Sequence, residues 1–326
     1  MITRDQFRER VFERDNHTCV VPGCNAPAVD AHHILERHLW LADDPYPEGY
    51  HLANGASVCE LHHRACESNA IPPQALRRWL NLETVLPQQL DPNKIWNKWG
   101  EEIKSSLHFH AKYPGTPYFP FSETVDLDDD LIDIQCLLNK PLMFTIKMDG
   151  SNVVLTKDRV AARNGLEANH ESFDYLKALH GGFKALIPDG IQLFGEWLYA
   201  KHSIHYIDNL ALPDYLQIFA VYEQKTQLFW SYDEAVQFCA SRGFAFVPVI
   251  GKATFEKEWA LIDYVSRLAQ SYIKLGQEGL VAKSAYPYHY GQHSQNVAKV
   301  VRPNHVQTST HWKKQRVVKN ELTRRQ

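Results

Sequence analysis

The chain has 326 residues, of which 44% are hydrophobic and 22% charged, and its formal net charge is −3. This length allows two domains with separate cores, and the composition is that of a soluble globular protein. The small negative charge excludes binding of nucleic acid through overall charge, so such binding has to depend on local patches. The charged N-terminus MITRDQFRER excludes a signal peptide, and no apolar run approaches the length of a membrane span, so we expect a cytoplasmic protein that inserts into no membrane.

Residue usage divides the chain into two parts. No lysine occurs before Lys94, although the first 80 residues contain eight arginines, and all closely spaced pairs that include a cysteine lie before residue 70. After Lys112 the sequence becomes β-rich and aromatic, with alternating runs such as IQLFGEWLY and LQIFAVYE. We therefore predict an α+β protein with a first domain at 1–80, a partly helical connector at 81–109 and a second domain at 110–326.

The first domain contains two short-spaced pairs of potential metal ligands. Cys19 and Cys24 form the first pair, and Cys59 and His62 in CELHH form the second. This pattern predicts a closed, structural zinc site with three Cys ligands and one His ligand, which would stabilise a domain with a thin core. In a cytoplasmic protein, cysteines more often bind metal or pack in a core than form disulfides. The alternative is a set of buried cysteines and unrelated surface histidines.

Further motifs in this region are not needed for a zinc site. They are DAHHI at 30–34, Asn54 and the last histidine of CELHH, His63. With the two pairs, they follow the order found in zinc-bearing members of the HNH endonuclease family, which residues 4–70 resemble.

The resemblance to the HNH family implies a small ββα-metal fold and specific roles. His32 and His63 would hold a catalytic divalent cation, and His33 would be the general base that activates water. Asn54 would fix the loop that orients His33. Two features depart from the family: His62 replaces a usual cysteine, and the first 80 residues carry eight basic and eleven acidic side chains. Because that charge is a poor match for nucleic acid, an inactive zinc-binding adaptor is the alternative.

The stretch TIKMDGSN at 145–152 has an Asp-Gly pair between two β-rich runs, which predicts a hairpin turn next to Lys147. Five further motifs follow along the chain: RNG (163–165), FGEWLYAKHSI (194–204), QIFAVYE (217–223), EGLVAK (278–283) and AKVVR (298–302). Each is weak alone. Their order and spacing resemble the covalent nucleotidyltransferase superfamily of ATP-dependent ligases and capping enzymes, over about 110–310.

That resemblance implies an ATP-grasp-like adenylation domain with antiparallel sheets, in which Lys147 takes AMP from ATP. Asn152 stands where DNA ligases usually carry Arg, and GEWLYAKHSIHY is similar to bacterial members of the phage-type RNA ligases that seal nicks in duplex RNA. With about two dozen residues after AKVVR, we also expect no OB-fold to follow it. We therefore expect a ligase that joins 3′-OH and 5′-phosphate ends, with RNA preferred and DNA possible. A DNA nick ligase and a capping-type guanylyltransferase are the alternatives.

The nucleophile must be neutral to attack, but a free lysine has a pKa near 10.4. We expect the cations of Lys283 and Lys299, together with a bound metal, to lower the pKa of Lys147. The resemblance assigns the remaining roles. For ATP, Glu196 would contact the ribose, Phe219 would stack on the adenine, Asn152 and Arg163 would bind the nucleotide, and Lys283 and Lys299 would neutralise the α-phosphate. Arg163 and Arg302 would contact nucleic-acid phosphate, and Glu278 with Asp149 would hold Mg²⁺ or Mn²⁺.

The C-terminal stretch HWKKQRVVKNELTRR (311–325) carries six Lys or Arg residues and one acid. It is suited to following a phosphate backbone, and a solvated charged tail is the alternative. A nuclease joined to a ligase suggests end processing followed by repair of a nucleic acid. The sequence does not indicate an oligomeric state.

Overall fold

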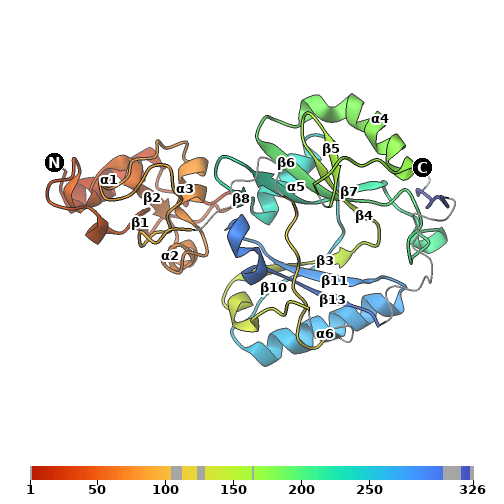
Figure 1. Ribbon diagram of the computed structural model, residues 1–326. Coiled ribbons are helices and arrows are strands. Elements are labelled where there is room, and N and C mark those ends of the chain that lie inside the picture. Colours follow the sequence, from red (N-terminus) through yellow and green to blue (C-terminus); the bar gives the residue numbers. More distant parts are fainter. Residues whose placement is uncertain (1, 104–111, 123–128, 164, 304–316, 324–326) are drawn as a thin grey trace. The chain divides into compact units, whose positions relative to one another are not determined.

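The chain divides into two compact units (Figure 1). A computed structural model describes residues 2–103, 112–122, 129–163, 165–303 and 317–323. The units are Met1–Leu107 with Tyr286–Gly291, and His108–Ala285 with Gln292–Gln326. Both combine helices with sheets whose strands are mainly antiparallel, which confirms the α+β prediction. None of the described helices is long and apolar enough to cross a membrane.

The first unit is built around a short antiparallel strand pair. Its elements are α1 (Arg4–Arg14), β1 (Asp30–His33), β2 (Gly55–Val58), α2 (Glu60–Glu67) and α3 (Pro73–Trp79), with 3-10 turns at Arg37–Leu39, Pro47–Gly49 and Leu52–Asn54. A capping box between Thr3 and Gln6 begins α1, whose buried Phe7 and Val11 pack against Ala31 of β1. Because β2 leads directly into α2, the start of this helix lies beside the first residue of β1.

The predicted connector forms turns in its described part. Residues 81–103 contain no helix, and their only paired backbone element is the bridge between Trp96 and Glu102. The prediction of a partly helical connector is wrong for these residues. Pro87 and Pro92 lack the backbone N–H that an inner helical turn requires. Residues 104–109 lie outside the described part of the chain.

The second unit contains a four-stranded sheet in the order β10-β3-β11-β13. Its strands are β3 (Pro141–Lys147), β10 (Val249–Thr254), β11 (Gly279–Ser284) and β13 (Val297–Val301). Helix α6 (Glu258–Lys274) covers one face of this sheet (Figure 1). Its Leu261, Val265 and Ala269 are spaced four residues apart and therefore lie on one side of the helix, packed against buried side chains of the strands.

The strands of a larger sheet that belong to this unit have the order β8-β7-β6-β4-β5, with β9 beside β7. Its strands are β4 (Ser151–Leu155), β5 (Val160–Ala162), β6 (Ile191–Trp197), β7 (Leu216–Glu223), β8 (Leu228–Phe229) and β9 (Ala245–Phe246). Helices α4 (Asp174–Phe183) and α5 (Tyr232–Ala240) contribute Leu176 and Phe238 to its core. The runs IQLFGEWLY and LQIFAVYE thus form the predicted strands, as β6 and β7.

Short elements complete the fold. They are β12 (Tyr288–His289) and the 3-10 turns Ile134–Leu137, Glu171–Phe173, Lys184–Leu186, Asp208–Leu210 and Tyr290–Gln295.

The predicted hairpin at TIKMDGSN is wrong. Strand β3 pairs with β10 and β11, whereas β4 pairs with β5 and β6 in the other sheet. Met148–Gly150 is therefore a link between two sheets, and we call it the nucleophile link after the role predicted for Lys147. Met148 is buried in an apolar cluster with Leu198 and Tyr206, and this long-range packing overrides the local Asp-Gly signal. The link leaves Lys147 at the end of β3.

Candidate active site and ligand clusters

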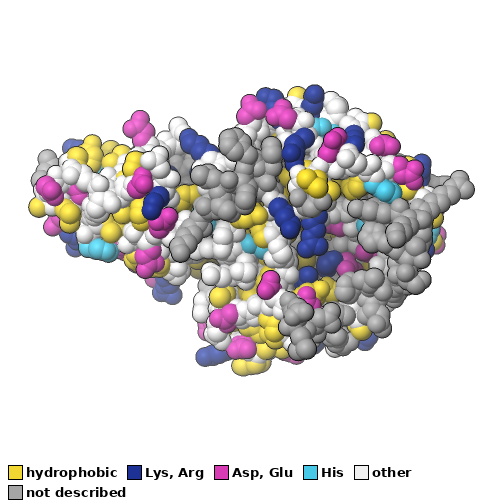
Figure 2. All heavy atoms as spheres, in the orientation of Figure 1, with side chains coloured by type: hydrophobic (Ala, Val, Ile, Leu, Met, Phe, Trp, Pro, Cys, Tyr) yellow, Lys and Arg dark blue, Asp and Glu magenta, His cyan; other side chains and the backbone are white. Residues whose placement is uncertain are grey.

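Strand ends from both sheets line a cavity of about 400 Å³ in the second unit. Nine of the side chains predicted from the ligase resemblance line it: Lys147, Asp149, Asn152, Arg163, Glu196, Phe219, Glu278, Lys283 and Lys299. Four of these nine are cationic and three are carboxylates. In Figure 2, Lys and Arg side chains gather on one face of this unit. Such a cavity is suited to a polyanionic ligand.

Arg302 is the one predicted residue of this set that does not line the cavity. It follows β13, and its backbone N–H donates to the carbonyl oxygen of Glu278 at 2.9 Å. Its Nε atom is buried without a hydrogen-bond partner among the described residues. The predicted contact of Arg302 with nucleic-acid phosphate therefore has no support from the geometry of the cavity.

Strand pairing places Lys147 beside Glu278. Lys147 lies opposite Gly279 in the β3–β11 register, and its Nζ donates to Oε2 of Glu278 at 2.6 Å. A side chain at position 279 would not fit, because a Cβ there would be 2.0 Å from the carbonyl oxygen of Val300. Gly279 thus lets β13 approach closely enough to bring Lys299 into the same cavity.

The surroundings of Lys147 favour its ammonium form in this structure. Burial lowers its pKa, but three carboxylates outweigh burial and raise the pKa above the ordinary lysine value. They belong to Glu278, Glu196 and Asp149. The expectation that Lys283 and Lys299 lower the pKa of Lys147 is therefore wrong for the ligand-free protein, because the nearest charge to the amine is a carboxylate.

The two other cavity lysines have lowered pKa values instead. Burial lowers the pKa of Lys283 to about 7, and burial together with the charge of Lys147 lowers that of Lys299 to about 8. Lys283 Nζ donates to the carbonyl oxygen of Phe219 at 2.6 Å, and Lys299 Nζ lies 3.8 Å from the ring centre of Tyr118. A bound phosphate would favour the charged form of both amines.

The opposite wall of the cavity carries Glu196, Asn152 and Phe219. Glu196 accepts a hydrogen bond from the N–H of Gly150 at 3.1 Å, and burial raises its pKa to about 8. Asn152 lies opposite Glu196 in the β4–β6 register, and its buried Oδ1 has no hydrogen-bond partner among the described residues. The ring of Tyr113 meets that of Phe219 edge to face at 4.8 Å. This wall therefore offers an aromatic surface and an unused acceptor.

Asp149 holds the nucleophile link in place. Its N–H donates to the hydroxyl oxygen of Tyr206 at 2.9 Å, and its Oδ2 accepts from the N–H of Ile204 at 2.6 Å. One carboxylate oxygen is thus already committed to backbone. Glu278 likewise has one oxygen engaged, because its Oε2 accepts from Lys147 Nζ at 2.6 Å, so these contacts do not rank the two predicted metal ligands.

In the first unit, the predicted zinc ligands come together. One ligand atom each from Cys19, Cys24, Cys59 and His62 lies within 4.8 Å of the others. The His62 Nδ1 atom is 3.2 Å from Cys19 Sγ and 3.3 Å from Cys59 Sγ, and the Cys24 and Cys59 sulfurs are 3.9 Å apart. Tetrahedral zinc with bonds of about 2.0–2.3 Å separates its ligands by roughly 3.5–3.8 Å. The four side chains therefore fit this ion.

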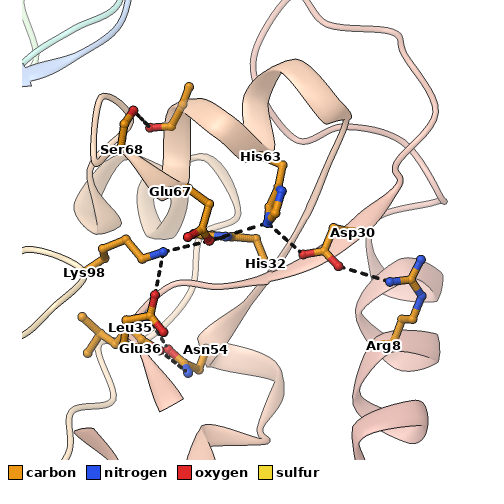
Figure 3. A network of polar contacts seen from close by, with 11 residues as sticks. Arg8, Asp30, His32, Leu35, Glu36, Asn54, His63, Glu67, Ser68 and Lys98 are labelled. Atoms are coloured by element: carbon orange, nitrogen blue, oxygen red, sulfur yellow. Dashed lines mark hydrogen bonds and ion pairs between the residues drawn. The ribbon is translucent and has the colours of Figure 1, made fainter. Parts of the chain in front are cut away.

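A second cluster of potential ligands is formed by residues of β1 and α2. Asp30, His32 and His63 bring their ligand atoms within 4.8 Å of one another. Figure 3 shows that Glu67 and Lys98 point toward the same cluster. Glu67 Oε1 lies 3.2 Å from His32 Nδ1 and 2.8 Å from Lys98 Nζ, and these contacts lower the pKa of Glu67 to about 2. The predicted cation ligands His32 and His63 therefore lie beside two carboxylates, those of Asp30 and Glu67.

His33 lies outside this cluster of ligand atoms. Its ring stacks on Phe7 at 4.6 Å and meets Tyr50 at 5.4 Å, and burial lowers its pKa to about 4. It is therefore neutral at pH 7, as a general base must be. Asn54 is fully buried and bonds the backbone of Leu35 through both its Oδ1 and its Nδ2, at 2.9 and 3.1 Å, close to His33 in the chain.

Several residues of these sites were not predicted from the sequence. Asp30 could have been found, because residues two apart in a strand share a face with His32. Glu67 could have been found as the residue four positions after His63 on a helix. Lys98 and Tyr113 carry no local signal, because their places depend on folding of distant segments.

Residues 140–301, just under half of the chain, match the model of the RNA ligase family. No curated protein matches the chain. Among solved structures, a putative ATP-dependent DNA ligase from Aquifex aeolicus is 20% identical, over 58% of this chain and 49% of that chain, with a TM-score of 0.39. An archaeal ATP-dependent RNA ligase is 14% identical, over 75% and 64%, with a TM-score of 0.43. A mutant Naegleria gruberi RNA ligase with ATP and Mn is 16% identical, over 68% and 70%, with a TM-score of 0.37.

This chain thus spans about half the length of the Aquifex chain and less than two thirds of the archaeal one. All three TM-scores are below 0.5, so the assignment depends on the family match alone. The segment 140–301, which contains all nine predicted side chains of the cavity, matches the RNA ligase family.

Proposed function

We propose that the second unit is an ATP-dependent RNA ligase that joins 3′-OH and 5′-phosphate ends through a lysyl-AMP at Lys147. The observation that carries this proposal is the cavity itself. It gathers a lysine nucleophile, two further lysines, an arginine and three carboxylates within a segment that matches the RNA ligase family. No single motif of the chain would support the same conclusion.

In the first step, Lys147 Nζ would attack the α-phosphorus of ATP. The ammonium first loses one proton to solvent and becomes a neutral amine. A P–N bond then forms while the P–O bond to the β-phosphate breaks, pyrophosphate leaves with the electron pair, and the nitrogen releases a second proton to solvent. Since Glu278 holds the amine protonated, the ion pair between Lys147 and Glu278 has to separate first. A Mg²⁺ or Mn²⁺ ion bound with the triphosphate would supply positive charge, and the carboxylates of Glu278 and Asp149 would hold it.

The other cavity residues would bind and orient the nucleotide. Lys283 and Lys299 would neutralise charge that develops on the α-phosphate. Phe219 would stack on the adenine, Glu196 would accept from the ribose, and Asn152 and Arg163 would contact ATP or the 5′-phosphate of the RNA. AMP would then pass to that 5′-phosphate, and the 3′-OH would displace AMP to close the nick.

Incubation with α-labelled ATP or GTP, followed by denaturing electrophoresis, tests the first step. We expect labelling by ATP alone, and labelling by GTP would favour a capping-type guanylyltransferase. Matched nicked duplexes with RNA or DNA at the 3′-OH side test the substrate. Equal or better sealing of DNA would contradict the RNA preference and favour the DNA nick ligase.

We further propose that the first unit binds structural zinc and is a metal-dependent HNH nuclease. The two ligand clusters favour this function. Cys19, Cys24, Cys59 and His62 would hold the zinc. The second cluster would hold the divalent cation through His32 and His63, with Asp30 as an additional ligand. His33 would take a proton from the attacking water, and Asn54 would keep its loop in place.

A further inference from the structure

The described C-terminal segment 317–323 belongs to the second unit and is hydrogen-bonded to the loop 198–212 of that unit. The N–H of Lys201 donates to the carbonyl oxygen of Val318 at 2.7 Å, and the N–H of Leu212 donates to that of Glu321 at 2.9 Å. These bonds attach the segment to both ends of the loop 198–212. The described part of the basic stretch is therefore held in place by backbone hydrogen bonds, while most of its side chains are exposed. The remainder of that stretch lies outside the described residues.

Asn320 is the centre of this attachment. It is only 2% exposed, and its side chain serves three backbone groups of the loop. Its Oδ1 accepts from the N–H of Tyr206 at 2.9 Å, and its Nδ2 donates to the carbonyl oxygens of Leu198 at 2.8 Å and Ala200 at 3.3 Å. An amide is suited to this place, because it combines an acceptor with two donors.

The loop that Asn320 holds contacts the nucleophile link directly. Tyr206 is 1% exposed, and its hydroxyl oxygen accepts from the N–H of Asp149. The N–H of Ile204 donates to the Asp149 carboxylate, and Met148 packs in one apolar cluster with Leu198, Ile204 and Tyr206. A shift of this loop would therefore move the residues that directly follow Lys147.

We propose that Asn320 is a positioning residue for Lys147, acting through Tyr206 and the nucleophile link. This inference rests on the proposed ligase function. Asn320 does not line the cavity and lies outside the segment that matches the RNA ligase family, so it touches no reacting atom. Its effect is on geometry. A nucleophile displaced by about 1 Å can lose roughly a hundredfold in rate.

The test is the single-turnover rate of lysyl-AMP formation across a range of ATP concentrations. We expect Asn320→Ala to lower the rate at saturating ATP by about tenfold or more. The ATP concentration for half-maximal rate should change by less than about twofold, because the nucleotide contacts remain. Tyr206→Phe removes one hydroxyl from a buried ring that keeps its packing, and it should lower the saturating rate in the same way.

A double variant distinguishes positioning from a general loss of stability. If Asn320 acts through Tyr206, the double variant should be no slower than the slower single variant, because both changes break one path. Ser231→Ala is the matched control, since it removes the N-cap of α5 in the same unit, at a site that does not line the cavity, and should leave the rate unchanged.

Two results would overturn the inference while leaving the ligase intact: single variants within twofold of the wild-type rate, or fully additive effects in the double variant. Should Asn320→Ala fail to fold, Tyr206→Phe at the wild-type rate would overturn it equally. A wild-type protein that never forms lysyl-AMP would remove the proposed function and this inference together.

Discussion

The ion pair between Lys147 and Glu278 sets the protonation state of the proposed nucleophile in the ligand-free protein. The two side chains meet at 2.6 Å in a cavity that contains two further carboxylates, so the amine stays charged. Sequence reasoning identified both residues but predicted the opposite direction for the pKa of Lys147. The motifs indicate which cations share the cavity with the Lys147 amine. They do not indicate which charged group lies closest to it.

Glu278→Gln should therefore lower the pKa of Lys147 in the ligand-free protein. The amide removes the nearest negative charge, while burial, which favours the neutral amine, stays. An NMR titration of isotope-labelled lysine side chains measures this directly. The exposed amine of Lys157, paired with Asp189, is the internal control and should titrate as before. An unchanged or higher pKa of Lys147 would contradict the account.

At the scale of elements, the position of the nucleophile link depends on the close approach of Gly150 to the end of β6 and to Leu198, which follows β6. A Cβ at this position would lie 2.7 Å from the carbonyl oxygen of Trp197 and 2.8 Å from a methyl carbon of Leu198. Because one of the clashing atoms belongs to the backbone, a side chain at position 150 requires the link or the end of β6 to move.

Gly150→Ala should lower the free energy of unfolding by about 1–3 kcal/mol and slow lysyl-AMP formation by about tenfold or more. Gly181→Ala in α4 is the matched control, because a Cβ there meets nothing within 4 Å and alanine favours a helix. Thermal unfolding and the labelling rate measure the two effects. A Gly150→Ala protein as stable and as active as the control would refute the role of this contact.

The first unit should lose its stability with its zinc. We expect elemental analysis to find about one zinc ion per chain. Cys59→Ser should lower the zinc content to near zero. It should also lower the midpoint of thermal unfolding, because structural zinc contributes directly to folding. Cys136→Ala is the control, since this half-buried cysteine lies outside the ligand cluster. Wild-type protein without zinc, or full zinc content in Cys59→Ser, would disprove the site.

Elements with strong local patterns were predictable, and those set by tertiary packing were not. The alternating residues of β6 and β7 indicate strands wherever they pack. In contrast, TIKMDGSN resembles a hairpin locally, and only the burial of Met148 between distant segments separates β3 from β4. The ligand pairs Cys19–Cys24 and Cys59–His62 could be found by spacing, but Lys98 and Asn320 reach their sites from far along the chain.

At the scale of the whole molecule, the proposed activities belong to different units and should be separable. His33→Ala should abolish metal-dependent cleavage of nucleic acid and leave ATP labelling unchanged, while Lys147→Ala should do the reverse. Nuclease assays with several divalent metals, in parallel with labelling, measure both. Absence of cleavage by the wild-type protein, or cleavage that survives in His33→Ala, would count against the nuclease and favour a zinc-binding adaptor.

The contact pattern adds one feature that no motif indicated. Tyr286–Gly291 groups with the first unit, although it lies within the segment that matches the RNA ligase family. His62 of the zinc-ligand cluster meets the ring of Tyr286 at 6.0 Å. The chain therefore passes between its two units more than once. The predicted domains, which are single continuous ranges of sequence, do not describe this path.

The most direct test of the central claim is mass spectrometry of the protein after incubation with ATP and Mg²⁺, with the modified residue identified in a peptide. The account predicts AMP on Lys147 of the wild-type protein and of Lys157→Ala, and none on Lys147→Ala. AMP on a different residue, AMP retained by Lys147→Ala, or no AMP on the wild-type protein would contradict it.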